Sequence, residues 1–286
     1  MAAEIDRIVD AHVHLWDPDR TDMYPYLTGL RDLKMGDISG WARYFDQKTY
    51  FAEAANWNVQ KFVHVAAGTD FVGETRERQQ EADATGHPDA IIGGVSLRVP
   101  VAEAVEQLDA QMAASRFRGV RPMGGSTDVV PSAGVLAALE ERELVLEMLA
   151  RPDQIEGWAK ALEGWAHLTV VVEHAGWPDS GSDEEFTVWK GGMSRLASLG
   201  PSVHCKVSGL STGFGTIDVD TFRPWIEHCL ECFGVDRCFF ASNVPPDGAN
   251  GSFDDLYSTY SELTTDLDAA SREKLFASNA ERLYRC

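Results

Sequence analysis

Two histidines one residue apart lie near the N-terminus, in the stretch "VDAHVHLWDP" (9–18). Side chains in a β-strand alternate between two faces, so His12 and His14 are expected to share a face with Asp10, opposite an apolar face. Two imidazoles on one strand face can bind the same metal ion. The stretch therefore predicts half of a metal site, unless the histidines are packed in a core without a chemical role.

Further polar side chains interrupt later apolar runs. His174 follows "LTVVV" and shares the expected face of Val170 and Val172, so a third histidine arrives at the same level. Lys206 lies in "SVHCKVS", and a buried lysine is costly without an anionic partner. It is expected either to bind a substrate carboxylate or carbonyl, or to pair with a structural carboxylate. Arg121 could hold a carboxylate through a bidentate fork.

Weaker candidates surround these residues. Glu147 follows an apolar run, and Arg76 lies in a helix-like stretch where a charge is more often solvated. Four aromatic residues flank the polar ends and would suit the walls of a pocket for a ring-shaped substrate: Trp16, Tyr24, Tyr26 and Trp177. His64 suits a buried, hydrogen-bonded role as well as a catalytic one. The cysteines of "HCLECFGVDRC" (228–238) match a metal-binding motif only weakly, and we expect them to be buried structural thiols.

A repeated alternation of short β-rich runs and helix-like stretches must position these residues. Eight such units in one chain of this length predict a single (β/α)8 barrel over 1–286, rather than a doubly wound sheet, because no glycine-rich nucleotide loop follows the first run. Active-site groups of such barrels lie at the carboxyl ends of the strands. The expected strands are 7–15, 61–67, 90–97, 117–123, 143–149, 168–174, 202–208 and 237–242.

Composition limits the partners. The net charge of −20 argues against nucleic acid or an anionic membrane, and no apolar stretch approaches the length of a membrane span. The chain shows no secretion signal, and an odd number of cysteines, 5, is typical of a reducing compartment. We expect a cytoplasmic protein with a small-molecule substrate. Its oligomeric state is left open.

A set of short motifs occurs in order along almost the whole chain: "VDAHVHLWDP", "YPYL", "ETR", "FRGVR", "EHAGWP", "CKVSGL" and "ASNVPPDG". Together they resemble the amidohydrolase-2 branch of the amidohydrolase superfamily, nearest to lactonases that act on sugar lactones and on 2-pyrone-4,6-dicarboxylate. The resemblance implies a barrel hydrolase in which His12, His14 and His174 bind a divalent metal or, in metal-free members, the substrate. It also implies a carboxylate at the end of the eighth strand as general base.

The chain departs from that pattern at the eighth strand, where Asn243 replaces the usual aspartate, and after "GVR", where Pro122 replaces a histidine. An amide cannot accept a proton as a carboxylate does. We therefore expect His174 to act as base, with Asp247 as a substitute carboxylate. The site is expected to hold no metal or one weakly bound divalent ion, zinc being the first choice.

The resulting hypothesis is the opening of a small carboxylated or sugar-derived lactone by an activated water. Two alternatives stay open: a decarboxylase or hydratase of aromatic degradation, and a binding protein that has lost its catalytic base.

Overall fold

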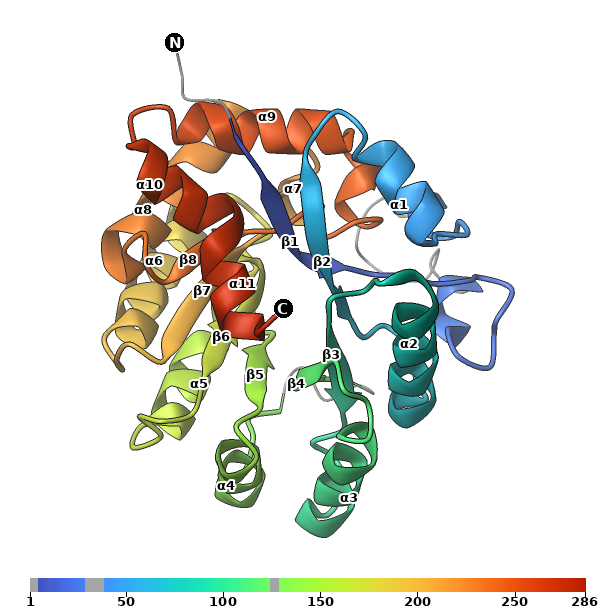
Figure 1. The fold of residues 1–286 in the computed structure, drawn as a ribbon. Coiled ribbons are helices and arrows are strands. Elements are labelled where there is room, and N and C mark those ends of the chain that lie inside the picture. Colours follow the sequence, from blue (N-terminus) through green and yellow to red (C-terminus); the bar gives the residue numbers. More distant parts are fainter. Residues whose placement is uncertain (1–4, 29–38, 124–128) are drawn as a thin grey trace.

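Eight parallel strands form a nearly closed barrel in the order β1 to β8, with helices around it (Figure 1). The computed structural model describes residues 5–28, 39–123 and 129–286. Hydrogen bonds from His14 N to Val244 O and from Asn243 N to His12 O, both 2.9 Å, join the first strand to the segment after the eighth. The strands are β1 (Ile8–Val13), β2 (Val59–Val65), β3 (Ala90–Val95), β4 (Phe117–Pro122), β5 (Val145–Met148), β6 (Val170–Val172), β7 (Val203–Val207) and β8 (Cys238–Phe240).

The barrel fold predicted from the sequence is confirmed, and each expected strand range contains or overlaps an observed strand. Helices follow the strands and pack outside them, as Figure 1 shows. They are α1 (Gln47–Glu53), α2 (Phe71–Thr85), α3 (Val101–Gln111), α4 (Ala133–Glu141), α5 (Ile155–Leu162), α6 (Asp183–Ala197), α7 (Leu210–Phe214), α8 (Val219–Phe233), α9 (Phe253–Leu263), α10 (Ala269–Glu273) and α11 (Asn279–Tyr284).

Two separate apolar clusters fill the molecule. The larger one lies between the strands and the outer helices. The smaller one joins inward-facing residues of six strands with side chains of the C-terminal segment, so it is the interior of the barrel. Helix α11 closes this interior near the amino ends of the strands, where Arg118 at the start of β4 donates to the carbonyl of Tyr284. The carboxyl ends are thus left for a site.

The side chains of β1 do not keep the simple alternation that the sequence predicts. Val9 and Ala11 belong to the interior cluster, whereas Val13 belongs to the outer one. An irregularity in the pairing of β1 with β2 lies between Asp10 and Val13, and it shifts the phase of the strand there. A β-bulge re-aims the residues that follow it. The expectation that Asp10 faces inward with the histidines was therefore wrong.

Asp10 lies on the outer side of the barrel, where its carboxylate accepts hydrogen bonds from Tyr50 Oη (2.8 Å) and Ser242 N (2.9 Å). The second of these bonds ties the segment after β8 to β1. Burial raises the pKa of Asp10, while the Ser242 and Tyr50 hydrogen bonds oppose that rise. The carboxylate thus fixes the seam at which the barrel closes.

Replacing Asp10 by alanine should lower the free energy of unfolding by about 3 kcal/mol, because it leaves buried donors without an acceptor. Urea denaturation followed by circular dichroism measures this loss. The exposed Asp266, replaced by alanine in the same way, should change stability by less than about 0.5 kcal/mol. Equal stability of the two variants would contradict a structural role for Asp10.

Candidate active site

The polar residues at the carboxyl ends of the strands form two layers. An upper layer keeps a small exposure to solvent: His14 (4%), Arg121 (8%), His174 (5%) and Asn243 (4%). A lower layer is fully buried, with 0% exposure: His12, Glu147, Glu173 and Lys206. The upper layer is therefore the floor that a substrate can reach, and the lower layer supports it.

Hydrogen bonds fix the tautomers of the two β1 histidines. His14 Nδ1 lies 2.8 Å from the carbonyl of Val65, which can only accept, so Nδ1 carries the proton. His14 Nε2 is 3.1 Å from His12 Nε2 and accepts from it. Burial first, and then nearby cations, lower the pKa of both rings well below the ordinary value, so both are neutral. Nδ1 of His12 then carries a lone pair, and none of the residues that the structure describes is a hydrogen-bond partner for it.

His174 reaches the floor by leaving the strand pattern. The backbone of His174 and Ala175 is left-handed, with φ of 53° and 50°. His174 does reach the other histidines, as the sequence predicts. Strand alternation is not the cause, because Val172 belongs to the outer cluster and a regular strand would have pointed His174 outward as well. Its ring lies 4.7 Å from that of His12, and its Nδ1 is 3.0 Å from Ser208 Oγ.

Gly209 makes room for this ring. Its φ is +68°, and a Cβ atom built on it would lie 2.5 Å from Cγ of His174. A side chain here would meet both backbone strain and a clash, so only glycine fits. The loop after β7 thus packs its backbone directly against the imidazole and holds it in place.

Glu173 is the central residue that the sequence reasoning missed. It shares the inward phase of Val171 at the end of β6, and this carboxylate after an apolar run was the available signal. Its Oε2 lies 3.4 Å from Arg121 Nη1, and its Oε1 lies 4.0 Å from Lys206 Nζ. Burial opposes the charge, but Arg121 and Lys206 lower the pKa of Glu173 below its ordinary value, so it is ionised.

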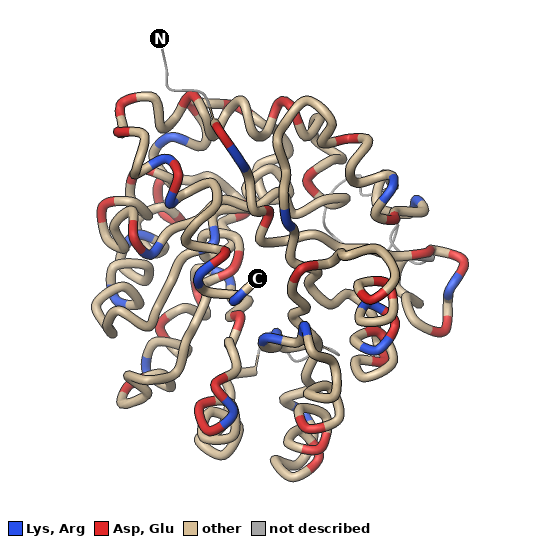
Figure 2. Tube along the Cα trace, in the orientation of Figure 1, with Lys and Arg blue, Asp and Glu red and all other residues tan. Residues whose placement is uncertain are grey.

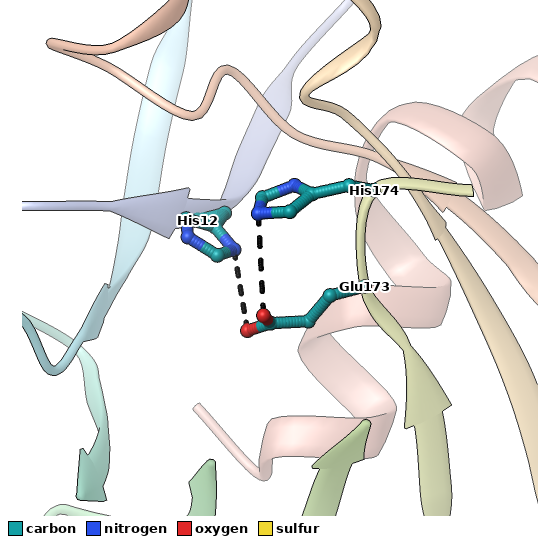
Figure 3. Close-up of side chains that lie close together, drawn as sticks. All are labelled: His12, Glu173 and His174. Carbon is teal, nitrogen blue, oxygen red and sulfur yellow. Dashed lines mark ion pairs between the residues drawn. The ribbon is translucent and has the colours of Figure 1, made fainter. Parts of the chain in front are cut away.

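Glu173 faces two of the histidines (Figure 3). Its Oε1 is 3.7 Å from His12 Nδ1, and its Oε2 is 4.0 Å from His174 Nε2. Oε1, like His12 Nδ1, has no hydrogen-bond partner among the described residues. Two acceptors without described hydrogen-bond partners therefore face each other in a fully buried place.

Lys206 and Glu147 lie beneath this group rather than open to a substrate. Lys206 Nζ donates to Glu147 Oε2 at 2.5 Å, to Ala11 O at 3.2 Å and to Tyr284 Oη at 3.3 Å. Tyr284 in turn donates to Glu147 Oε1. An ammonium group has three N–H donors, and all three have acceptors here. The structure thus favours the alternative of a structural pair over direct substrate contact by either residue.

Asp247 is also committed elsewhere. Its carboxylate accepts hydrogen bonds from Gly209 N (2.9 Å), Thr212 N (3.0 Å) and Thr212 Oγ1 (2.6 Å). It therefore anchors the loop after β7, and these bonds favour a structural role over the expected role as a substitute for the missing base. Asn243, by contrast, uses its backbone for the hydrogen bonds that the described residues show, and its φ is 52°. Asparagine tolerates this left-handed conformation better than most residues.

The remaining candidates divide between the pocket and the scaffold. The ring of Trp16 stacks on His14 with centroids 5.5 Å apart, and Trp177 meets His174 edge-on at 5.7 Å. Tyr24 is buried, and its hydroxyl oxygen lies 3.3 Å from both Leu15 O and Glu74 Oε1, so its single proton is shared within the scaffold. Arg76 is exposed on α2, which favours the alternative of a solvated charge over substrate contact.

A comparison with protein-family models matches residues 9–286 to a family described as "Amidohydrolase". The chain belongs to this family. The protein y4mH of Sinorhizobium fredii is 30% identical to this amidohydrolase over 97% of the chain and 98% of its own length. An L-fucono-1,5-lactonase of Burkholderia ambifaria is 27% identical over 97% and 95%.

Among solved structures, an amidohydrolase from Burkholderia multivorans with bound zinc has a TM-score of 0.81 and 23% identity, covering 97% of this chain and 99% of its own. This likeness supports the barrel fold. Asp and Glu residues are spread along the outer helices of this amidohydrolase (Figure 2), in keeping with its net charge of −20. None of the described helices has the length and apolar character that a bilayer span requires.

The donor set of this amidohydrolase fits a small divalent cation. One ligand atom each of His12, Glu173 and His174 lies within 4.8 Å of the others, and the bare acceptors His12 Nδ1 and Glu173 Oε1 converge there. Nitrogen and carboxylate ligands of this kind suit zinc. The set differs from the expected one, because Glu173 takes the place of His14. Arg121 and Lys206 lie near Glu173 and weaken the attraction for a dication.

Titration calorimetry with zinc should therefore show one weak site, and E173Q should weaken binding at least about tenfold because it removes the charged ligand. H228A is a matched control, since His228 lies on α8 and bonds Ser194 away from the barrel mouth. The absence of heat with the wild type, or equal affinity of E173Q, would exclude this cluster as a zinc site.

Proposed function

We propose that this amidohydrolase hydrolyses a lactone, the cyclic ester of a small ring. The observation that carries the proposal is the neutral imidazole of His174 on the same floor as the Arg121 guanidinium. Ester hydrolysis needs a base for water and a positive group for the oxyanion, and these two groups provide both. The lactonase relative makes a lactone the first ester to test.

His174 is suited to take the proton from water. Burial first, reinforced by Arg121 and Lys206, lowers the pKa of His174 to about 4, so the ring is neutral near pH 7. His174 Nδ1 lies 3.0 Å from Ser208 Oγ, and in this proposal Nδ1 donates to that hydroxyl, which leaves the lone pair of Nε2 free toward the floor. The lone pair of His14, in contrast, already accepts from His12. His174 is therefore the base in this proposal.

Arg121 and Asn243 would handle the substrate. Nε of Arg121 has no partner among the described residues, and one Nη is shared with Glu173. The guanidinium can therefore donate to the carbonyl oxygen as it becomes an oxyanion. The amide of Asn243 can orient the water or the ring oxygen but cannot replace the base. Trp16 and Trp177 supply aromatic walls.

The proposed reaction adds the oxygen of water to the carbonyl carbon while His174 Nε2 takes a proton. Collapse of the tetrahedral intermediate breaks the bond to the ring oxygen, which takes the proton back, and a hydroxy acid is released. Zinc, when held by His12, Glu173 and His174, would supply positive charge for polarising water or a carbonyl. It would also use the lone pair that His174 needs as base, so added zinc should slow this reaction.

A pH-stat screen of five- and six-membered sugar lactones and pyrone carboxylates tests the activity. H174N should lower kcat roughly 100- to 10,000-fold, the usual range for loss of a general base. H228N, a histidine substitution outside the site, should leave kcat within about twofold. No turnover of any lactone by the wild type would refute the proposal, and an active H174N would place the base elsewhere.

The pH profile provides a second test. Because the pKa of His174 is lowered to about 4, kcat/KM should stay level down to about pH 5 and fall only as the ring is protonated near pH 4. If the base were a histidine of ordinary pKa, half of the enzyme would be protonated at the base, and half of kcat/KM lost, already near pH 6.5. Circular dichroism at each pH separates protonation from unfolding. A fall centred at pH 6 to 7 would contradict the lowered pKa.

A further inference from the structure

The ammonium group of Lys206 lies in the barrel interior, against the backbone of β1. Its contact with Ala11 O is the only one of its three hydrogen bonds, among those described, that reaches the strand of the paired histidines. Ala11 directly precedes His12 and lies within the irregular part of β1, between Asp10 and Val13. The ammonium group therefore bonds the chain where β1 changes phase.

The phase change decides where His12 points. Ala11 is an interior residue and Val13 an outer one, so His12 joins the interior only because the strand slips between them. The other bonds at the bulge come from outside the barrel interior. On the β8 side, Asn243 N donates to His12 O (2.9 Å) and Ser242 N to the Asp10 carboxylate (2.9 Å), and Tyr50 Oη of α1 donates to the same carboxylate (2.8 Å). Among the described residues, Lys206 is the side chain that bonds this segment from inside the barrel.

The direction of His12 in turn fixes the histidine chain. His12 Nε2 must face His14 for the 3.1 Å contact, and only then does His12 Nδ1 face Glu173 at 3.7 Å. We propose that Lys206 is a positioning residue, which holds the β1 bulge through Ala11 O and thereby sets the orientation and tautomers of His12 and His14. The proposal rests on the proposed function for its kinetic consequences alone, since the tautomers can be measured without substrate.

The double variant K206M/E147M removes the bond to Ala11 O and, at the same time, both titratable members of the buried pair. Removing both partners avoids an unpaired buried charge, which would destabilise the barrel by itself. Y284F is the matched control, because it removes two hydrogen bonds from the same cluster and leaves the Lys206 bonds to Ala11 and Glu147 in place.

Nitrogen-15 NMR of histidine-labelled protein reads the tautomers, with His12 and His14 assigned by single substitutions. The wild type should show the proton of His14 on Nδ1 and that of His12 on Nε2. In K206M/E147M both signals should shift toward a tautomer mixture. Because the ring of His12 packs 4.7 Å from that of His174, the proposed base, His174 should be misplaced as well, and kcat should fall about 100-fold with KM nearly unchanged. Y284F should keep the wild-type signals and kcat within about twofold.

Wild-type histidine signals in a folded K206M/E147M would overturn the proposal. The other bonds at the bulge would then be sufficient to hold the histidines in place. Shifted signals in Y284F would also overturn it, because the cluster as a whole would then be responsible. If the double variant does not fold, K206Q/E147Q replaces it, since two neutral amides can bond each other, and glutamine is one atom shorter than lysine and does not reach Ala11 O as well. An enzyme without lactonase activity would refute the proposed function and leave the NMR result valid.

Discussion

The pairing of buried charges inside the barrel is the constraint on which the site depends. Glu147 and Glu173 end neighbouring strands, and their carboxylates are balanced by Lys206 and Arg121. Ionised groups without exposure are stable only when they are paired and hydrogen-bonded. The pairs therefore specify which strand ends can lie side by side, and the histidines are arranged around them. The histidines are neutral because burial and the nearby cations lower their pKa values.

Much of this architecture could be predicted from the sequence. The apolar runs identified all eight strands, because parallel strands covered on both faces need continuous apolar residues. The inward phase of Lys206 also followed from alternation, because β7 is regular. The prediction of which way a side chain points failed where the backbone of a strand is irregular. Neither the bulge before His12 nor the left-handed turn at His174 has a signature in residue type alone.

The sequence also could not predict which hydrogen-bond and ion-pair partners each acidic residue finds. Asp247 and Glu173 are both acidic residues close to the ends of strands, and a pattern of residue types cannot rank them. Tertiary contacts decide: Asp247 binds backbone and side-chain donors of the loop after β7, whereas Glu173 faces imidazoles and cations. For Asn243, residue type alone predicts that its side chain cannot serve as base. The structure adds that it takes a left-handed backbone, which its residue type tolerates.

The place of α11 has a consequence for how the chain acquires its shape. Tyr284 contributes to the barrel interior, and β1 is joined to the segment at Val244, far along the sequence. During synthesis the first strand leaves the ribosome long before either partner exists. Its histidine-bearing segment therefore keeps an unpaired edge until the segment at Val244 has been made. An unpaired strand edge can pair with other chains, so the nascent protein is most exposed to aggregation in that interval.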